Sequence, residues 1–292
     1  MVKICVIGSC AVDLVVTSDR RPGAGETVLG ESFRIVPGGK GANQAVAAAR
    51  LGAEVVMIGR VGEDNFGDVI LNNLKLNGVN TSHVEAAPNL ESGTAHIVLA
   101  EGDNSIVVVK GANDLVTPEY IRQKLNVIQE MDIVLIQQEI PEDTVAYVSH
   151  ICTQAGIPLL LNPAPAREVD PSVIEHAAYL TPNEHEAALL FGGLSPAQAL
   201  RKYPNKLIIT EGAQGARYYN GREEVLVPAY KVEVVDTTGA GDTFNAAFAV
   251  SIAEGKSIFE SVRFANRAAS LSVAGFGAQG GMPARDEVEA GL

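Results

Sequence analysis

Cysteine is scarce in this sequence. The three that occur, Cys5, Cys10 and Cys152, have neither a C-x-x-C spacing nor a neighbouring pair of histidines. This pattern gives no support to a disulfide framework or a zinc site, so we expect buried free thiols.

Long apolar runs are also missing. Stretches such as 132–137 and 158–161 are far shorter than the ~20 residues that a membrane-spanning helix requires. The N-terminus passes directly into 3–8, which has the pattern of a strand and lacks the regions of a signal peptide. We therefore expect a cytoplasmic protein without a membrane partner.

Positive charge is in deficit. The chain has 22 lysines and arginines against 35 aspartates and glutamates, a formal net charge of -13. An acidic surface of this kind disfavours nucleic acids and anionic membranes and favours a small-molecule partner. An anionic ligand such as ATP must then be held by local backbone donors, side-chain cations or metal ions.

Short apolar runs alternate with segments of helical periodicity along all 292 residues. We expect buried parallel strands at 3–9, 54–61, 132–138, 158–162 and 206–210, and helices at 42–51, 66–77, 118–128 and 143–154. The alternation predicts an α/β fold with a doubly wound, mainly parallel, Rossmann-like sheet in a single domain spanning 1–292.

Two regions interrupt the alternation, at about 13–37 and 94–110. Each contains a pair of apolar, β-branched runs around a turn rich in glycine and polar residues. We expect these pairs to form a small separate β-sheet that covers the carboxyl ends of the main strands as a lid. The alternative is that they only extend the main sheet.

The segment 234–245 reads Val-Val-Asp-Thr-Thr-Gly-Ala-Gly-Asp-Thr-Phe-Asn and leads into an apolar helical pattern. A Gly-rich turn that opens a helix presents unpaired amides and the positive end of the dipole to an anion. Asp242 in isolation would be interpreted as a helix-capping acid. Asp236, Thr237 and Thr238 crowd the same turn, which favours phosphoryl transfer with Asp242 as the base.

This segment resembles the DTxGAGD hallmark of the ribokinase (PfkB) family of carbohydrate kinases. The resemblance implies that Asp242 is the catalytic base and that Gly239, Ala240 and Gly241 supply the amides of an anion hole. It also implies a ribokinase-like fold, ATP as phosphate donor, Mg²⁺ and a homodimer joined through the lid.

A second Gly-rich loop, Gly-Gly-Lys-Gly-Ala-Asn-Gln-Ala at 38–45, opens a helix and lacks the spacing of a Walker loop. Taken alone, a Gly-rich turn before an Ala-rich helix indicates only close packing of the backbone. It is similar to a stretch typical of ribokinases within the family. With Gly8-Ser-Cys-Ala-Val-Asp13 and Gln137-Gln-Glu139, it implies a sugar-binding set formed by Asp13, Gly39, Lys40, Gly41, Asn43, Glu139 and Asp242.

The second half of the chain carries the implied nucleotide and metal residues. Thr181-Pro-Asn-Glu-His-Glu186 resembles the PNxxE motif and also has the pattern of a helix cap. The implied ATP-binding residues are Asn183, Glu186, Thr210, Gly212, Gly215, Gly241 and Asn266, with Mg²⁺ organised near Asn183 and Glu186. The implied ligands of an activating K⁺ are Asp236, Thr238, Ser272, Gly275, Gly277 and Gly281, although the family often has serine where Gly281 stands.

Ala11 also departs from the family, which commonly has asparagine there to contact the sugar. We expect D-ribose to be phosphorylated at O5, with 2-deoxyribose as the alternative substrate. A nicotinamide dehydrogenase is the rival from another enzyme class, but the turn after the first predicted strand lacks GxGxxG. A non-catalytic sugar or nucleotide sensor is the remaining rival, and the presence of Asp242 beside an intact Gly turn disfavours it.

Overall fold

A six-stranded parallel sheet forms the centre of the protein, seen in a computed structural model that describes all 292 residues. The strand order is β10-β9-β8-β1-β4-β5. The bounds are β1 (Lys3–Ile7), β4 (Glu54–Gly62), β5 (Asn80–Ala87), β8 (Ile133–Ile136), β9 (Leu159–Leu161) and β10 (Tyr179–Leu180). The doubly wound parallel sheet predicted from the sequence is confirmed.

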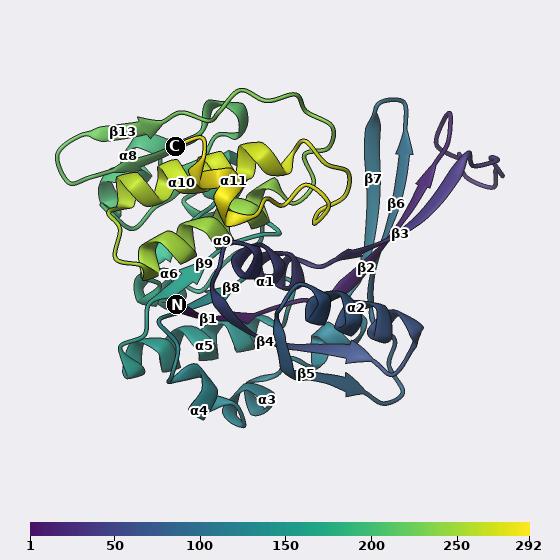
Figure 1. Cartoon of the computed structure of the whole chain (residues 1–292), viewed down its shortest axis with the longest axis horizontal. Helices are drawn as coiled ribbons and strands as arrows, with labels where there is room; N and C mark the ends of the chain where they lie inside the picture. Colours follow the sequence, from purple (N-terminus) through teal and green to yellow (C-terminus); the bar gives the residue numbers. More distant parts are fainter.

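Helices cover both faces of this sheet (Figure 1). Ile4 and Val6 of β1 belong to one hydrophobic core. Helices α1 (Lys40–Arg50), α2 (Asn65–Leu76), α9 (Ala240–Ala253) and α10 (Ile258–Ser272) contribute to the same core. Their neighbours Cys5 and Ile7 join a second core. The helices on that side are α3 (Pro118–Arg122), α4 (Leu125–Ile128), α5 (Glu142–Ala155), α6 (Pro171–His176), α7 (Glu184–Leu190) and α8 (Pro196–Lys202). Because successive side chains of a strand point to opposite faces, a continuous apolar run fills both cores.

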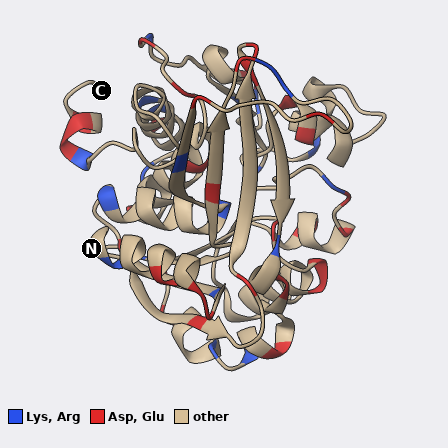
Figure 2. Ribbon diagram, turned by 90° about the vertical axis from the view of Figure 1, so that its right-hand side faces the viewer, with Lys and Arg blue, Asp and Glu red and all other residues tan.

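A second sheet stands beside the first, with the order β3-β2-β6-β7 (Figure 1). Its strands are β2 (Ala11–Thr17), β3 (Ser32–Gly38), β6 (Gly93–Ala100) and β7 (Asp103–Val109). Glu101 and Gly102 join β6 to β7 with φ of 57° and 74°, as a two-residue primed hairpin turn requires. The predicted small sheet from two distant segments is confirmed. Figure 2 views it face-on, and few residues of its strands are coloured as charged.

One expectation about the strands was wrong. The run 206–210 forms β11 (Ile208–Thr210), which pairs antiparallel with β12 (Ala216–Tyr219) and, through it, with β13 (Glu224–Val227). Only isolated parallel bridges, such as Leu180 with Leu207, connect it to the main sheet. The chain reverses at Gly212–Gln214, so its own hairpin satisfies the backbone groups of β11. The edge strands β5 and β10 were not predicted, because β5 begins with four polar residues and β10 has only two residues.

The predicted helix at 118–128 is broken into α3 and α4, and α11 (Arg285–Glu289) closes the chain. None of the helices is long and apolar enough to cross a bilayer. The arrangement brings the carboxyl ends of β1 and β8 together with the N-terminus of α1. The backbones of Gly8 and Gly41 nearly touch there, since a Cβ on Gly41 would lie 2.6 Å from the carbonyl carbon of Gly8.

Candidate active site

Helix α9 begins at Ala240, directly after the Gly-rich turn. Gly239 has φ of 80°, and an added Cβ would collide with the carbonyl oxygen of Ala278, so only glycine fits. An added Cβ on Gly241 would meet nothing within 4 Å. The amides of Gly241 and Asp242 donate to no other group of the chain. The turn therefore presents free donors at the positive end of a 14-residue helix, which is a site for an anion.

Asp242 lies in the first turn of α9 and is 6% exposed. Asn43 Nδ2 donates to its Oδ2 at 2.9 Å, and Gln44 Nε2 donates to its Oδ1 at 3.0 Å. Burial raises the pKa of Asp242, against the opposing effects of Lys40 and of these two amides. A carboxylate with a raised pKa is a better proton acceptor than an ordinary surface aspartate.

The loop before α1 brings the other predicted sugar-binding groups to this carboxylate. Gly39 caps α1 with φ of 85°, and Lys40 follows it as the first helical residue. The Lys40 amide donates to Oε2 of Glu139 at 3.0 Å, and the Ser9 hydroxyl donates to the same oxygen. Burial opposes the charge on Lys40, but the carboxylates of Asp242 and Glu139 outweigh it and raise the pKa of Lys40.

Asp13 lies on β2 at the base of the second sheet, where its carboxylate packs against Gly38 of β3. Any side chain at position 38 would collide with that carboxylate. Burial, together with the nearby carboxylates of Glu139 and Asp242, raises the pKa of Asp13 to about 6. Asp13, Lys40, Glu139 and Asp242 thus form one electrostatically coupled group.

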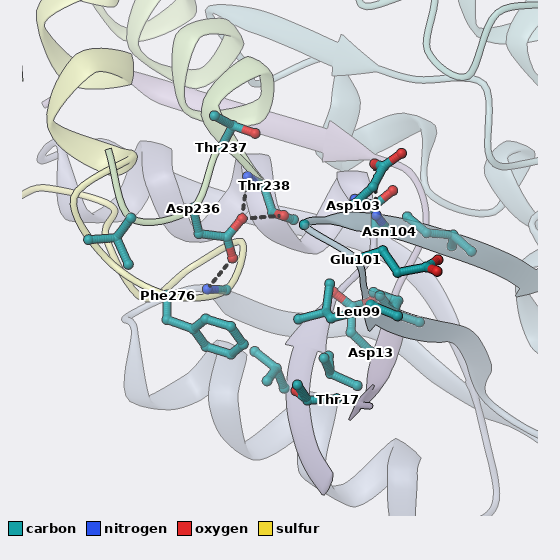
Figure 3. Close-up of a pocket in the computed structure, with 18 of the residues that line it drawn as sticks. Asp13, Thr17, Leu99, Glu101, Asp103, Asn104, Asp236, Thr237, Thr238 and Phe276 are labelled. Carbon is teal, nitrogen blue, oxygen red and sulfur yellow. Dashed lines mark hydrogen bonds between the residues drawn. The ribbon is translucent and has the colours of Figure 1, made fainter. Parts of the chain in front are cut away.

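A cavity of about 580 Å³ opens between the second sheet and the Asp236 loop. Asp13 lines it, and so do Asp236 with Thr238 and the turn between β6 and β7 (Figure 3). Apolar side chains of the sheet, Val36 and Ile97 among them, complete the wall. A volume of this order is typical of small-molecule sites.

Asp236 organises the loop in front of α9. Its Oδ1 accepts from the amide and hydroxyl of Thr238 at 2.9 and 2.7 Å, and its Oδ2 accepts from the Gly277 amide at 2.9 Å (Figure 3). Burial alone would raise the pKa of Asp236, but these hydrogen bonds prevail and hold it below its usual value. The carboxylate therefore ties the segment 236–238 to the segment 272–281.

The segment 272–281 is closed by backbone contacts between glycines. A Cβ on Gly275 would lie 2.5 Å from the Cα of Gly281, and a Cβ on Gly281 would collide with the carbonyl oxygen of Ser272. The serine that is common in the family at position 281 cannot be placed here without moving Ser272. This position therefore offers only backbone to a ligand.

The predicted nucleotide residues lie around a third sheet, which consists of β11, β12 and β13. Asn183 and Glu186 form the capping box of α7, with reciprocal hydrogen bonds of 2.8 Å, so the predicted helix cap is present. Thr210 ends β11 and bridges to Asn183, with Gly212 and Gly215 in the turn that follows. Asn266 is buried on α10 and donates to the carbonyl of Val227 at 2.7 Å, which joins that helix to the end of β13.

Sequence reasoning missed three buried groups of this site: Ser9, Gln44 and Gln137. Gln44 donates to Asp242 and accepts from Gln137 Nε2 at 2.6 Å, and neither glutamine side chain is exposed. Ser9 donates to Glu139. Gln44 and Ser9 stand inside the motifs at 38–45 and 8–13, which was the only signal that could have marked them.

The raised pKa of Asp13 predicts a pH-dependent cost in stability. The folded-state pKa is about 6 against an ordinary value of 3.8, so the folded chain binds more protons than the unfolded chain between these pH values. Stability is therefore lost as the pH rises through this window. Asp13→Asn should raise the Tm above pH 6, and the gain should vanish near pH 4. Thermal melts at pH 4 to 8 would measure it, with exposed Asp19→Asn as the control. A gain independent of pH would contradict this interpretation.

Comparison with known proteins adds a family to this geometry. Residues 1–285 match the model of the pfkB family carbohydrate kinases. The chain is 67% identical over 289 residues to ribokinase of Bacillus subtilis, covering 99% of each chain. It is 38% identical over 295 residues to deoxyribokinase of Salmonella typhi, covering 97% of this chain and 96% of that one.

The structural comparison points the same way. Arabidopsis thaliana ribokinase, solved in complex with ribose and ATP, superposes with a TM-score of 0.92 at 35% identity, covering 99% of this chain and 98% of that one. The resemblance drawn from the two Gly-rich segments is thereby confirmed. The chain belongs to the pfkB family of carbohydrate kinases.

Proposed function

We propose that this chain is an ATP-dependent pentose kinase that phosphorylates D-ribose at O5 to give D-ribose 5-phosphate. The observation that carries the proposal is the buried Asp242 carboxylate beside the free amides of Gly241 and Asp242 at the N-terminus of α9. A base and an anion site lie side by side, which is what transfer of a phosphoryl group to a hydroxyl requires. The higher identity to a ribokinase than to a deoxyribokinase favours ribose over 2-deoxyribose.

In the proposed reaction Asp242 accepts the proton of the O5 hydroxyl as O5 forms its bond to the γ-phosphorus. The bond from that phosphorus to the bridging oxygen breaks, and ADP leaves with the electron pair. The amides of Gly239 to Asp242 hold the negative charge on the transferring group. Burial lowers the pKa of Lys40, but the surrounding carboxylates outweigh this effect and raise it. Lys40 therefore keeps its positive charge beside the reacting groups.

The sugar would be held between the loop before α1, the end of β8 and the second sheet. Asp13 and Glu139 accept from its hydroxyls, Asn43 and Lys40 donate, and Gly39 and Gly41 let it approach the backbone. The second sheet acts as the lid in a single domain, 1–292, and excludes water that would otherwise hydrolyse ATP.

ATP would lie across the third sheet, in contact with Asn183, Glu186, Thr210, Gly212, Gly215, Gly241 and Asn266. The Glu186 carboxylate, buried and bonded to the Asn183 amide through one oxygen, fits a role beside hydrated Mg²⁺. When bound, Mg²⁺ neutralises phosphate charge. Three buried free thiols and the requirement for ATP support a cytoplasmic location.

K⁺ fits the backbone cradle between Asp236 and the segment 272–281. A Cβ on Gly281 would collide with the carbonyl oxygen of Ser272, so only backbone lines this part of the cradle, and its proposed donors are a carboxylate and carbonyl oxygens, which suit a large hard cation. The proposed ligands are Asp236, Thr238, Ser272, Gly275, Gly277 and Gly281. When bound, the ion would order the loop before α9 without touching the substrate.

A homodimer would cover the outer face of the second sheet. Alternation along the strands places Phe33, Ile35 and Val107 on the face that points away from the cavity, and they are 59%, 48% and 66% exposed. Two copies packed through this face would remove these side chains from water.

Sedimentation at micromolar concentration should give a dimer, and Phe33→Lys should shift it toward monomer. A wild-type monomer would contradict the proposal.

Asp242→Asn tests the assignment of the base. The substitution keeps size and burial but removes the proton acceptor, so kcat with ribose should fall by at least ~10² while ATP binding is largely kept. A coupled ADP-release assay measures kcat, and calorimetry measures ATP binding. Near-wild-type turnover would overturn the assignment, and a lower Tm with unchanged kcat would reduce Asp242 to a helix cap.

Replacement of K⁺ tests the cradle. Activity should rise with K⁺ and respond poorly to Li⁺, which is too small to reach all the carbonyl oxygens at once. Ionic strength is held constant with a bulky organic cation. Equal activity in Li⁺ and K⁺ would show that the cradle holds no activating cation.

Ala11 tests the choice of sugar. It is 8% exposed on β2 and lies opposite Gly38 and Gly93 on the neighbouring strands. An apolar pocket wall lowers kcat/KM by only ~10²-fold for a substrate that carries an extra hydroxyl. A polar site that bonds a hydroxyl lowers kcat/KM by ~10⁴-fold for a substrate that lacks it. The kcat/KM for 2-deoxyribose should therefore come close to that for ribose. Ala11→Asn should widen the ribose preference by about 1 to 2 kcal/mol, one net hydrogen bond. Wild-type rejection of deoxyribose by more than ~10³ would show that another group reads the 2-hydroxyl.

A further inference from the structure

A continuous chain of side-chain amides connects Arg50, at the end of α1, to the Asp242 carboxylate. Arg50 Nε donates to Asn77 Oδ1 at 2.9 Å, and Asn77 Nδ2 donates to the backbone carbonyl of Asn73 at 2.8 Å and lies 3.4 Å from Asn73 Oδ1. Asn73 Nδ2 donates to Gln279 Oε1 at 2.7 Å. Gln279 Nε2 donates to Asn43 Oδ1 at 2.9 Å, and Asn43 Nδ2 donates to Asp242.

The two ends of this chain determine its direction. A guanidinium can only donate hydrogen bonds, and an ionised carboxylate can only accept them. Each amide between them must therefore accept from the Arg50 side and donate toward Asp242. The assignment of oxygen and nitrogen in the four amides follows from these ends, because a flipped amide would oppose two donors or two acceptors.

Gln279 is the link that joins the segment 272–281 to the active site. It is 5% exposed, and Arg50 Nη1 also donates to its backbone carbonyl at 2.7 Å. Asn43 has two amide hydrogens, of which one is directed to Asp242. The other is free for a sugar hydroxyl only while Gln279 donates to Asn43 Oδ1 and holds the amide in this orientation.

We infer that Gln279 is a positioning residue for the base, acting through Asn43. It keeps the Asn43 amide nitrogen on Asp242, so that the carboxylate stays ionised and aimed at the acceptor hydroxyl. This inference rests on the proposed function for its catalytic consequence, but the orientation of Asn43 and its effect on Asp242 can be measured without turnover.

The other charged groups that face Asp242 come from four elements. Lys40 of α1 favours its ionised form, whereas Glu139 after β8 disfavours it. Asp13 of β2 and Glu186 of α7 also interact with Asp242 unfavourably. None of these groups is altered by a substitution at position 279. Gln279→Glu adds a charge that itself repels Asp242, whereas Gln279→Met adds none, so a change in the titration of Asp242 in Gln279→Met reports the amide chain.

The test uses two variants of the full-length chain. Gln279→Met removes the donor to Asn43 without adding charge, and Gln279→Glu adds an acceptor that forces Asn43 to turn its carbonyl toward Asp242. Both should lower kcat more than they raise KM for ribose. The midpoint of the acid limb of kcat against pH should move up by about 1 pH unit in Gln279→Glu, the scale of one hydrogen bond to a charged group, and by less in Gln279→Met.

A carbon NMR titration of the aspartate carboxyls in the free protein provides the readout that does not depend on activity. Asp242 should titrate at higher pH in both variants than in the wild type. The control is Gln154→Glu, which adds the same charge on the exposed side of α5 and should leave both midpoints unchanged. If Gln279→Glu does not fold, Asn73→Asp, one link further from Asp242 and half-buried, reverses the same chain.

The outcomes separate the two proposals. Folded Gln279 variants with wild-type midpoints, or with a lowered Tm as their only change, would overturn the positioning role. If the wild type phosphorylates no pentose, the proposed function fails, and the NMR titration alone then decides the role of Gln279.

Discussion

The structure depends on keeping a carboxylate, Asp242, buried and ionised at the start of a helix. Desolvation opposes the charge, and each oxygen of the carboxylate needs a donor. Helix α1 supplies both donors from adjacent residues, Asn43 and Gln44, and this is possible only because α1 packs directly against α9. The parallel sheet beneath them brings the two helix N-termini to one edge, where the positive ends of both dipoles favour anions.

Close backbone approaches make this arrangement possible. Gly41 lies against Gly8, Gly239 lies against Ala278, and Gly281 lies against Ser272, each at a distance that excludes a Cβ. Without a side chain at these points, a loop, a helix start and a strand end can occupy a space that one side chain would fill. In the proposed function, backbone amides and carbonyls are the ligands of phosphate and cation, which would account for the binding of a polyanion by a chain with a formal charge of -13.

The fold could be predicted from the sequence, and so could the grouping of Asp13, Lys40, Glu139 and Asp242 at one place, but the buried partners of these residues could not. Apolar runs such as 3–7 identify buried parallel strands, and the crowding of Asp236, Thr238 and Asp242 around one Gly turn predicts phosphoryl transfer. The sequence did not mark Gln44, Gln137 and Gln279 as site residues, because a buried glutamine differs from an exposed one only in its tertiary contacts. The pairing of β11 was wrong for a related reason, since an apolar run predicts burial but does not specify the neighbouring strand.

The central claim is that Asp242 takes the proton of the sugar hydroxyl that is phosphorylated. A crystal structure of the wild-type chain with D-ribose and a non-hydrolysable ATP analogue tests it most directly. We predict the O5 hydroxyl within about 2.6–3.2 Å of an Asp242 carboxylate oxygen, with the γ-phosphate on the amides of Gly241 and Asp242. An O5 hydroxyl bonded to another group, with Asp242 out of reach and the phosphate away from α9, would contradict it.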